Sequence, residues 1–228
     1  MVPEKEMIPI RIKFSKLGNL MYISHLDLAR TMQRIILRSG IDIWYSEGFN
    51  PQPKMVFAFP LSIGVESVCE LLDIRLNSPM PYDEIKARLE NNFPDEMKVL
   101  DVYTPQIKFK NIAYIDYTIT LTSPKISSET GNEIVKLFEK ECTIVKKTKS
   151  GEKEVNISEG VKLVESTVNG STVSLHTILC ADNEKYLNPD HFIEAIRQKL
   201  NILNSDSIDE HYTILRNQML DEELKEFK

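Results

Sequence analysis

The sequence predicts an α+β protein made of antiparallel sheets in two similar halves. Segments in which apolar and polar residues alternate indicate strands with one buried face. Other segments carry apolar residues at helical spacing, and the order of elements in the first half recurs in the second. A chain of 228 residues is long enough for two small domains, each with its own core.

The first half begins with a strand and a helix that carry clear local signals. Residues 8–14, IPIRIKF, alternate apolar and basic side chains, which predicts a strand with one buried and one basic face. Ser24 can accept hydrogen bonds from the first amides of a helix, and Asp27 suits the positive end of the helix dipole. Apolar residues at helical spacing follow, and Gly40 is the predicted end of this helix.

The remainder of the first half adds strands and a second helix. Residues 41–45 form a short β-prone run, and the prolines of GFNPQPK exclude a helix or a central strand after it. Residues 81–93 are amphipathic with proline near the first turn, which predicts a helix. Further strands are predicted at residues 55–59, 69–76 and 97–103. The resulting order is strand, helix, strand, strand, helix, strand.

The second half repeats this order. Strands are expected at residues 112–121, 143–149, 161–167, 172–180 and 211–217, with a short extended piece at 154–157. Helices are expected at residues 127–141 and 188–200. We therefore predict two tandem ferredoxin-like (βαββαβ) domains with antiparallel sheets, residues 1–106 and 107–228, ending in a charged, frayed tail.

The charge distribution favours a local anion site over general coating of a polyanion. The net charge is −6, but residues 11–54 hold seven basic and three acidic residues, so this segment carries +4 and the remainder −10. The three cysteines are widely spaced without a metal-binding pattern, which is typical of buried thiols in a cytosolic protein. The start lacks a secretory signal, and no apolar run approaches the roughly 20 residues that span a bilayer. We expect a cytoplasmic protein.

An arginine row is the first candidate site. Arg30, Arg34 and Arg38 follow one another at four-residue spacing, so one helix face carries three guanidiniums. Guanidinium groups bind phosphate oxygens in a bidentate manner, and Arg11 and Lys13 on the preceding strand are expected to extend the surface. The alternative is a solvated helix face paired with carboxylates of this acidic chain.

His25 follows the helix cap and is the candidate catalytic residue. A neutral imidazole there can act as a general base or donate a hydrogen bond to a substrate oxygen. The alternative is a purely local structural bond. No histidine pair has metal-ligand spacing, so no metal site is expected.

The segment after the first helix is a candidate for stacking or docking. It combines aromatic residues, a rigid turn and a terminal lysine, Lys54. Aromatic rings can stack on bases while a lysine meets a phosphate. The alternative is that Trp44 and Phe49 fill the core. The residues singled out in this segment are Tyr45, Ser46, Gly48, Phe49, Asn50, Pro51 and Pro53.

Over residues 8–77 the sequence resembles a known family. Motifs that would supply nucleotide-driven, redox or radical chemistry are absent. Instead, the sequence matches K-x-G, S-H-L-D-L, Y-S-x-G-F-N-P-x-P-K and P-L-x-x-G-x-x-S. These motifs resemble the radical SAM-linked protein family, a bacterial domain of unknown function fused to or encoded beside a radical SAM protein. Gln52 departs from the family, many of whose members have histidine or another basic residue there.

The resemblance implies a partner and a substrate class. The radical SAM protein would contribute S-adenosylmethionine and an iron–sulfur cluster, with no cofactor in this chain, and neighbouring genes of family members hint at RNA. We therefore expect an RNA-binding accessory subunit that docks onto a radical SAM enzyme and presents an RNA substrate. Two alternatives stay open: a metal-independent endoribonuclease with His25 as general base, and a protein-binding scaffold.

Overall fold

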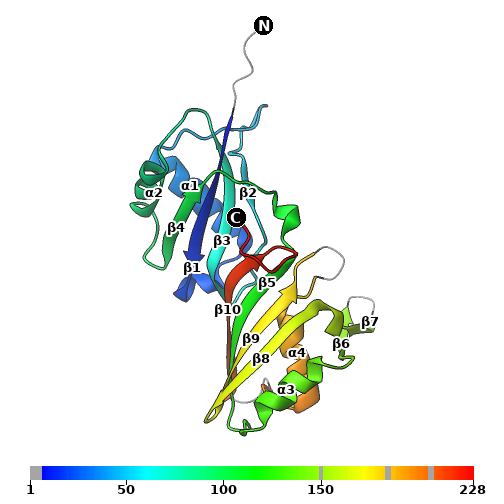
Figure 1. Cartoon of the computed structure of the whole chain (residues 1–228). Helices are drawn as coiled ribbons and strands as arrows, with labels where there is room; N and C mark the ends of the chain where they lie inside the picture. Colours follow the sequence, from blue (N-terminus) through cyan, green and yellow to red (C-terminus); the bar gives the residue numbers. More distant parts are fainter. Residues whose placement is uncertain (1–6, 149–150, 183–185, 205–207) are drawn as a thin grey trace. The chain divides into compact units, whose positions relative to one another are not determined.

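The chain divides into two compact units, residues 1–109 and 110–227. The computed structural model describes residues 7–148, 151–182, 186–204 and 208–228. The sequence-based boundary lies at residues 106 and 107, and residue 149, the predicted end of the strand at residues 143–149, lies outside the described residues. Each unit combines helices with antiparallel strands (Figure 1). Within the described residues, no helix is both long and apolar enough to cross a membrane.

The first unit contains an antiparallel sheet in the order β4-β1-β3, with β2 paired to β3. Its strands are β1 (Ile8–Lys16), β2 (Met55–Phe57), β3 (Val65–Leu76) and β4 (Met97–Tyr103). Its helices are α1 (His25–Ser39) and α2 (Tyr82–Glu90), with the 3-10 turn η1 (Gly18–Tyr22) between β1 and α1. In chain order the elements are therefore β1-α1-β2-β3-α2-β4, leaving η1 aside.

The core of the first unit lies between one face of the sheet and both helices. Alternate residues of β1, namely Ile10, Ile12 and Phe14, pack in one cluster with Met32 of α1 and Leu89 of α2. Because successive strand residues point to opposite faces, the intervening residues of β1 lie on the face away from the helices. The sheet therefore has one helix-covered face and one face that other segments must cover.

The second unit contains an antiparallel sheet in the order β10-β5-β9-β8. These strands are β5 (Tyr114–Thr122), β8 (Val161–Asn169), β9 (Thr172–Cys180) and β10 (His211–Leu220), and the helices are α3 (Thr130–Phe138) and α4 (Pro189–Leu200). The rings of Phe138 and Phe192 stack with centroids 4.1 Å apart, which joins the two helices. The short 3-10 turns η2 (Phe109–Asn111) and η3 (Ser158–Gly160) lie in connections.

Two further strands of the second unit stand apart from its main sheet. β6 (Thr143–Thr148) and β7 (Gly151–Asn156) pair only with each other among the described residues. The sequence correctly predicted extended structure here, but alternation within a strand does not reveal which strand is its partner. The β6–β7 hairpin is thus an insertion between α3 and β8.

Two local predictions were wrong. Residues 41–45 form no strand; they make only the isolated bridges of Ile43 to Leu76 and Tyr45 to Pro53. The last eight residues are not frayed. The Phe227 amide donates to the Met219 carbonyl at 2.9 Å, and the Phe227 side chain is 3% exposed, because the segment folds back and buries this large apolar ring.

Candidate functional site

The start of α1 is fixed by the signals that the sequence contains. The Ser24 hydroxyl accepts a hydrogen bond from the Asp27 amide at 3.1 Å, which is the bond that an N-cap residue makes. The same hydroxyl donates to the Asp27 carboxylate at 2.7 Å. At the other end, Gly40 adopts the left-handed conformation with φ of 64°, which ends the helix as predicted. His25 therefore occupies the first turn of a well-defined helix.

A groove of about 520 Å³ runs between α1 and β2. Its α1 wall includes His25, Arg30 and Gln33, and its other wall includes Gln52 and Phe57. The His25 ring meets the Phe57 ring edge to face, with centroids 5.1 Å apart. We call this hollow the His25 groove. It brings together the candidate catalytic residue and the first of the three arginines.

The arginine row, Arg30, Arg34 and Arg38, is exposed along α1. Arg30 lies 3.6 Å from the Asp27 carboxylate, an exposed ion pair of the kind that contributes roughly 0–1 kcal/mol. Within the described part of the chain, no carboxylate pairs with Arg34 or Arg38. The row is therefore not neutralised by the acidic remainder of the chain.

Residues 44–54 form a closed hairpin whose tip is exposed. The Ser46 amide donates to the Gln52 carbonyl at 2.8 Å, and the Gln52 amide donates to the Ser46 hydroxyl at 3.0 Å. Gly48, with φ of 125°, makes the turn that a side chain would disfavour. Phe49 at the tip is fully exposed, which excludes a role as a core residue.

The other residues singled out in the hairpin have supporting positions. Tyr45 and Pro53 face each other in the bridge at its base, and Asn50 accepts from the Gln52 side chain at 3.1 Å. Pro51 is exposed, and Pro53 also lines the His25 groove. The hairpin thus presents Phe49 on a backbone that is held by its own hydrogen bonds.

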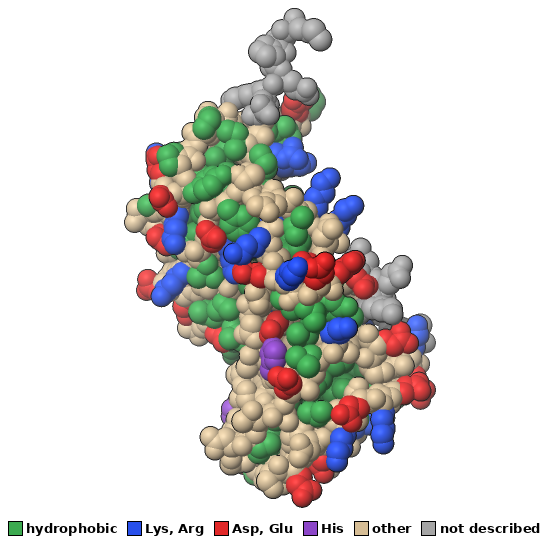
Figure 2. Space-filling view, viewed as in Figure 1, with side chains coloured by type: hydrophobic (Ala, Val, Ile, Leu, Met, Phe, Trp, Pro, Cys, Tyr) green, Lys and Arg blue, Asp and Glu red, His purple; other side chains and the backbone are tan. Residues whose placement is uncertain are grey.

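Lys54 does not reach the His25 groove. Its amine lies 5.7 Å from the centroid of the Trp44 ring, and the Arg75 guanidinium lies 6.0 Å from the same centroid. Trp44 is half-buried, so it acts as a support for two cations and not as a fully buried core residue. Figure 2, viewed as Figure 1, shows Lys and Arg side chains gathered along the edge of the first unit where β2 lies.

Arg11 and Lys13 do not extend the arginine row, which corrects the sequence-based expectation. Both lie on the sheet face away from α1, because their neighbours in β1 face the helices. Arg11 is fully buried and donates from Nε and Nη2 to the Asp73 carboxylate at 2.7 and 2.9 Å. Arg11 is thus a structural residue, and Lys13 is half-buried on the same face.

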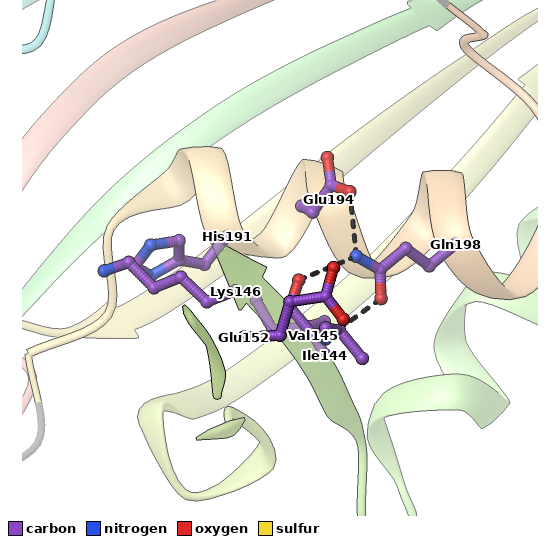
Figure 3. Close-up of a pocket in the computed structure, with 7 residues that line it drawn as sticks. All are labelled: Ile144, Val145, Lys146, Glu152, His191, Glu194 and Gln198. Atoms are coloured by element: carbon purple, nitrogen blue, oxygen red, sulfur yellow. Dashed lines mark hydrogen bonds between the residues drawn. The ribbon is translucent and has the colours of Figure 1, made fainter. Parts of the chain in front are cut away.

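A second hollow, of about 540 Å³, lies in the second unit between the β6–β7 hairpin and α4 (Figure 3). Gln198 of α4 bonds the backbone of Val145 in both directions, at 3.1 and 3.2 Å, and donates to Glu194 at 2.8 Å. His191 lies here as well, where burial and then the nearby Lys146 lower its pKa. The amide of Gln198 serves to fasten β6 to the helix, so we do not choose this hollow as the candidate site.

Sequence reasoning missed several residues of the first unit. Gln33 and Phe57 line the His25 groove, and Arg75 and Lys108 line another groove beside Lys54. The alternation within residues 69–76 was a usable signal for Arg75, since it puts this residue on the exposed face of its strand. Among the described residues, no group of three or more His, Cys, Asp or Glu side chains is placed to hold a metal ion.

The following similarities to solved structures are weak. A chain in the crystal structure of a Cbf5-Nop10-Gar1 complex is 11% identical with a TM-score of 0.48; the match covers 92% of this chain and 48% of that chain. An unknown protein from Galdieria sulphuraria is 6% identical with a TM-score of 0.27, and the match covers 92% of this chain and 99% of that chain. DyPB from Rhodococcus jostii RHA1 is 9% identical with a TM-score of 0.20, and the match covers 95% of this chain and 94% of that chain. TM-scores below 0.5 assign neither fold nor function.

Sequence comparison places the chain in a family. No curated protein matches it significantly. Residues 9–189, which include the arginine row, the His25 groove and the 44–54 hairpin, match the family described as "Uncharacterized protein conserved in bacteria (DUF2344)". The chain therefore belongs to the DUF2344 family of bacterial proteins.

Proposed function

We propose that this protein is an RNA-binding accessory subunit that docks onto a radical SAM enzyme and presents an RNA substrate to it. The observation that carries the proposal is the exposed arginine row beside the His25 groove, in which Arg34 and Arg38 have no carboxylate partner within the described residues. Three guanidiniums on one helix face are suited to successive phosphates, whereas a structural row would be paired.

The geometry supports a single-stranded RNA. Eight residues of α-helix advance about 12 Å, so Arg30 to Arg38 present a ladder of that length. Phe49 at the tip of the hairpin offers a free ring on which a base can stack, and such stacking contributes about 1–3 kcal/mol per base. In this arrangement the arginines hold the backbone and Phe49 holds a base.

The radical SAM partner rests on the sequence resemblance over residues 8–77. In the proposal, S-adenosylmethionine and the iron–sulfur cluster belong to that partner. We also assign the two units as tandem ferredoxin-like domains. The support is the strand order, β4-β1-β3-β2 in the first unit and β10-β5-β9-β8 in the second, which has the same connectivity once the β6–β7 insertion is removed.

The decisive experiment is charge reversal on the row. The Arg34→Glu/Arg38→Glu variant should bind single-stranded RNA at least about tenfold more weakly, because two guanidinium contacts are replaced by repulsion. The slope of log affinity against log salt should fall by about 1.4, since each phosphate contact on a single strand contributes about 0.7. Fluorescence anisotropy with a labelled oligonucleotide across a salt series measures both quantities.

A matched control separates local contacts from net charge. Lys136→Glu/Lys140→Glu in and just after α3 makes the same change in net charge at two exposed positions. It should leave most of the affinity intact. Equal loss in both variants would indicate non-specific electrostatics, and unchanged RNA binding in the arginine variant would refute the proposal. Retention of the partner enzyme by an RNA-free complex would favour a scaffold.

A metal-independent endoribonuclease is the second candidate, and the position of His25 favours it. His25 and Arg30 line the same groove, so a base and a phosphate-stabilising cation share one hollow. The test is RNA cleavage in the presence of a chelator by the unmutated protein and by His25→Ala. Cleavage lost in the variant would establish the activity; no cleavage by the unmutated protein removes this function.

A further inference from the structure

A separate groove lies on the face of the first unit's sheet that points away from the helices. It has a volume of about 370 Å³, within the range of small-ligand sites. Its apolar walls include Pro9, Val56 and Phe109. Arg75 alternates with the core residues of β3, and this alternation sets the groove on the open face. We call this hollow the Arg75 groove.

Three cations from separate segments converge on the Arg75 groove. Lys54 directly precedes β2, Arg75 is the penultimate residue of β3, and Lys108 directly precedes η2. The one carboxylate in the lining, Asp73, already accepts two hydrogen bonds from Arg11. Among the described residues no carboxylate pairs with any of the three cations. The groove therefore has an uncompensated positive charge and suits an anion.

Two aromatic rings, Phe109 and Trp44, contact cationic side chains in and beside this groove. The Arg11 guanidinium lies 4.2 Å from the centroid of Phe109, which fixes that half-buried ring in the groove wall. The Trp44 ring contacts both Lys54 and Arg75, and both cations line the groove. An apolar wall with an oriented ring beside clustered cations matches a ligand that is flat and apolar at one end and doubly charged at the other.

We propose that the Arg75 groove binds a nucleoside monophosphate. Lys54, Arg75 and Lys108 hold the phosphate, and the base packs against Phe109 and the apolar wall. The ligand is either a free nucleotide or the 5′-phosphorylated end of an RNA strand; only the second source rests on the function proposed above. The site is distinct from the arginine row, with which it shares no residue.

The chain contains its own reporter of binding. Trp44 is the single tryptophan and contacts two of the three cations. Titration with adenosine monophosphate should change its fluorescence in a saturable manner. Adenosine and inorganic phosphate should each bind at least about tenfold more weakly, because each lacks one half of the ligand. Calorimetry with the same three probes checks the fluorescence result.

Variants assign the signal to the groove. Lys108→Ala removes a cation that is not on the Trp44 ring, and it should weaken binding of adenosine monophosphate about tenfold, the size of one charge-assisted hydrogen bond. Lys98→Ala on β4, at the opposite edge of the first unit's sheet, should have no effect. Competition by a 5′-phosphorylated oligonucleotide but not its 5′-hydroxyl form identifies the strand end; no competition by either identifies the free nucleotide.

The outcomes also separate this inference from the proposed RNA function. Arg34→Glu/Arg38→Glu should lose RNA retention yet bind adenosine monophosphate normally. Three results would overturn the inference: no saturable binding of adenosine monophosphate, equal affinity in Lys108→Ala, or inorganic phosphate binding as tightly as the nucleotide, which would show an anion site without base recognition.

Discussion

The buried pair of Arg11 and Asp73 gives the sharpest prediction about the first unit. The Arg11 side chain is 0% exposed and the Asp73 side chain is 27% exposed. Besides Asp73, the Arg11 guanidinium donates to the Ile107 carbonyl at 2.9 Å and lies over Phe109. The two partners are therefore unequal, since the Asp73 carboxylate is partly open to water and the Arg11 guanidinium is not.

This inequality determines the energies of the single variants. Asp73→Ala removes the carboxylate that accepts two hydrogen bonds from the buried Arg11 guanidinium, and breaking a buried pair in this way costs about 3–5 kcal/mol. Arg11→Met keeps much of the side-chain volume and leaves the carboxylate partly hydrated, so we expect a cost of about 1–2 kcal/mol. The double variant Arg11→Met/Asp73→Leu should lie within about 1 kcal/mol of the unmutated protein, because an apolar pair replaces the ionic one.

Urea unfolding followed by Trp44 fluorescence measures the free energy of unfolding, and the single tryptophan confines the signal to the first unit. Equal losses in the two single variants, or a double variant as unstable as Asp73→Ala, would refute the reasoning from the unequal burial of the two partners. Arg11→Met should also retain RNA binding. Loss of RNA binding in this variant, with the fold intact, would show that Arg11 contributes to the RNA-binding surface.

Three further predictions concern the rest of the chain. The His176 ring donates a hydrogen bond to the Asp116 carboxylate, which raises the pKa of His176. The pair therefore stabilises the fold below the ordinary histidine pKa of 6.5, and this stability is lost as pH rises through the raised pKa. In Asp116→Asn, an NMR titration should show a lower His176 pKa and less of this pH dependence. Phe227→Ala should cost about 3 kcal/mol in chemical denaturation, because the Phe227 side chain is buried; a cost close to zero would contradict a packed tail. Gly18→Ala should cost about 1–2 kcal/mol in the same assay, because φ is +58° and the added Cβ would lie 2.9 Å from the Glu96 carboxylate.

Local signals predicted the elements of the site well. The cap at Ser24, the end at Gly40 and the spacing of the arginine row are properties of neighbouring residues, and the structure has all three. The strand predicted at residues 41–45 is absent, because the partners of this segment are distant in the sequence. The Trp44 amide donates to the Arg75 carbonyl while the Trp44 carbonyl accepts from the Lys54 amide, so its two bonds go to different segments and no ladder forms.

The sequence by itself determined which residues share a face of one helix or strand, because the periods of 3.6 and 2 are properties of the backbone. It correctly separated Arg11 from the core side chains of β1. Only the tertiary structure decided what covers that second face. Arg11 bonds Ile107, 96 residues along the chain, and such a partner leaves no trace in local periodicity. For the same reason, only the folded chain shows that Lys54 joins Arg75 and Lys108, and that the arginine row ends at the His25 groove.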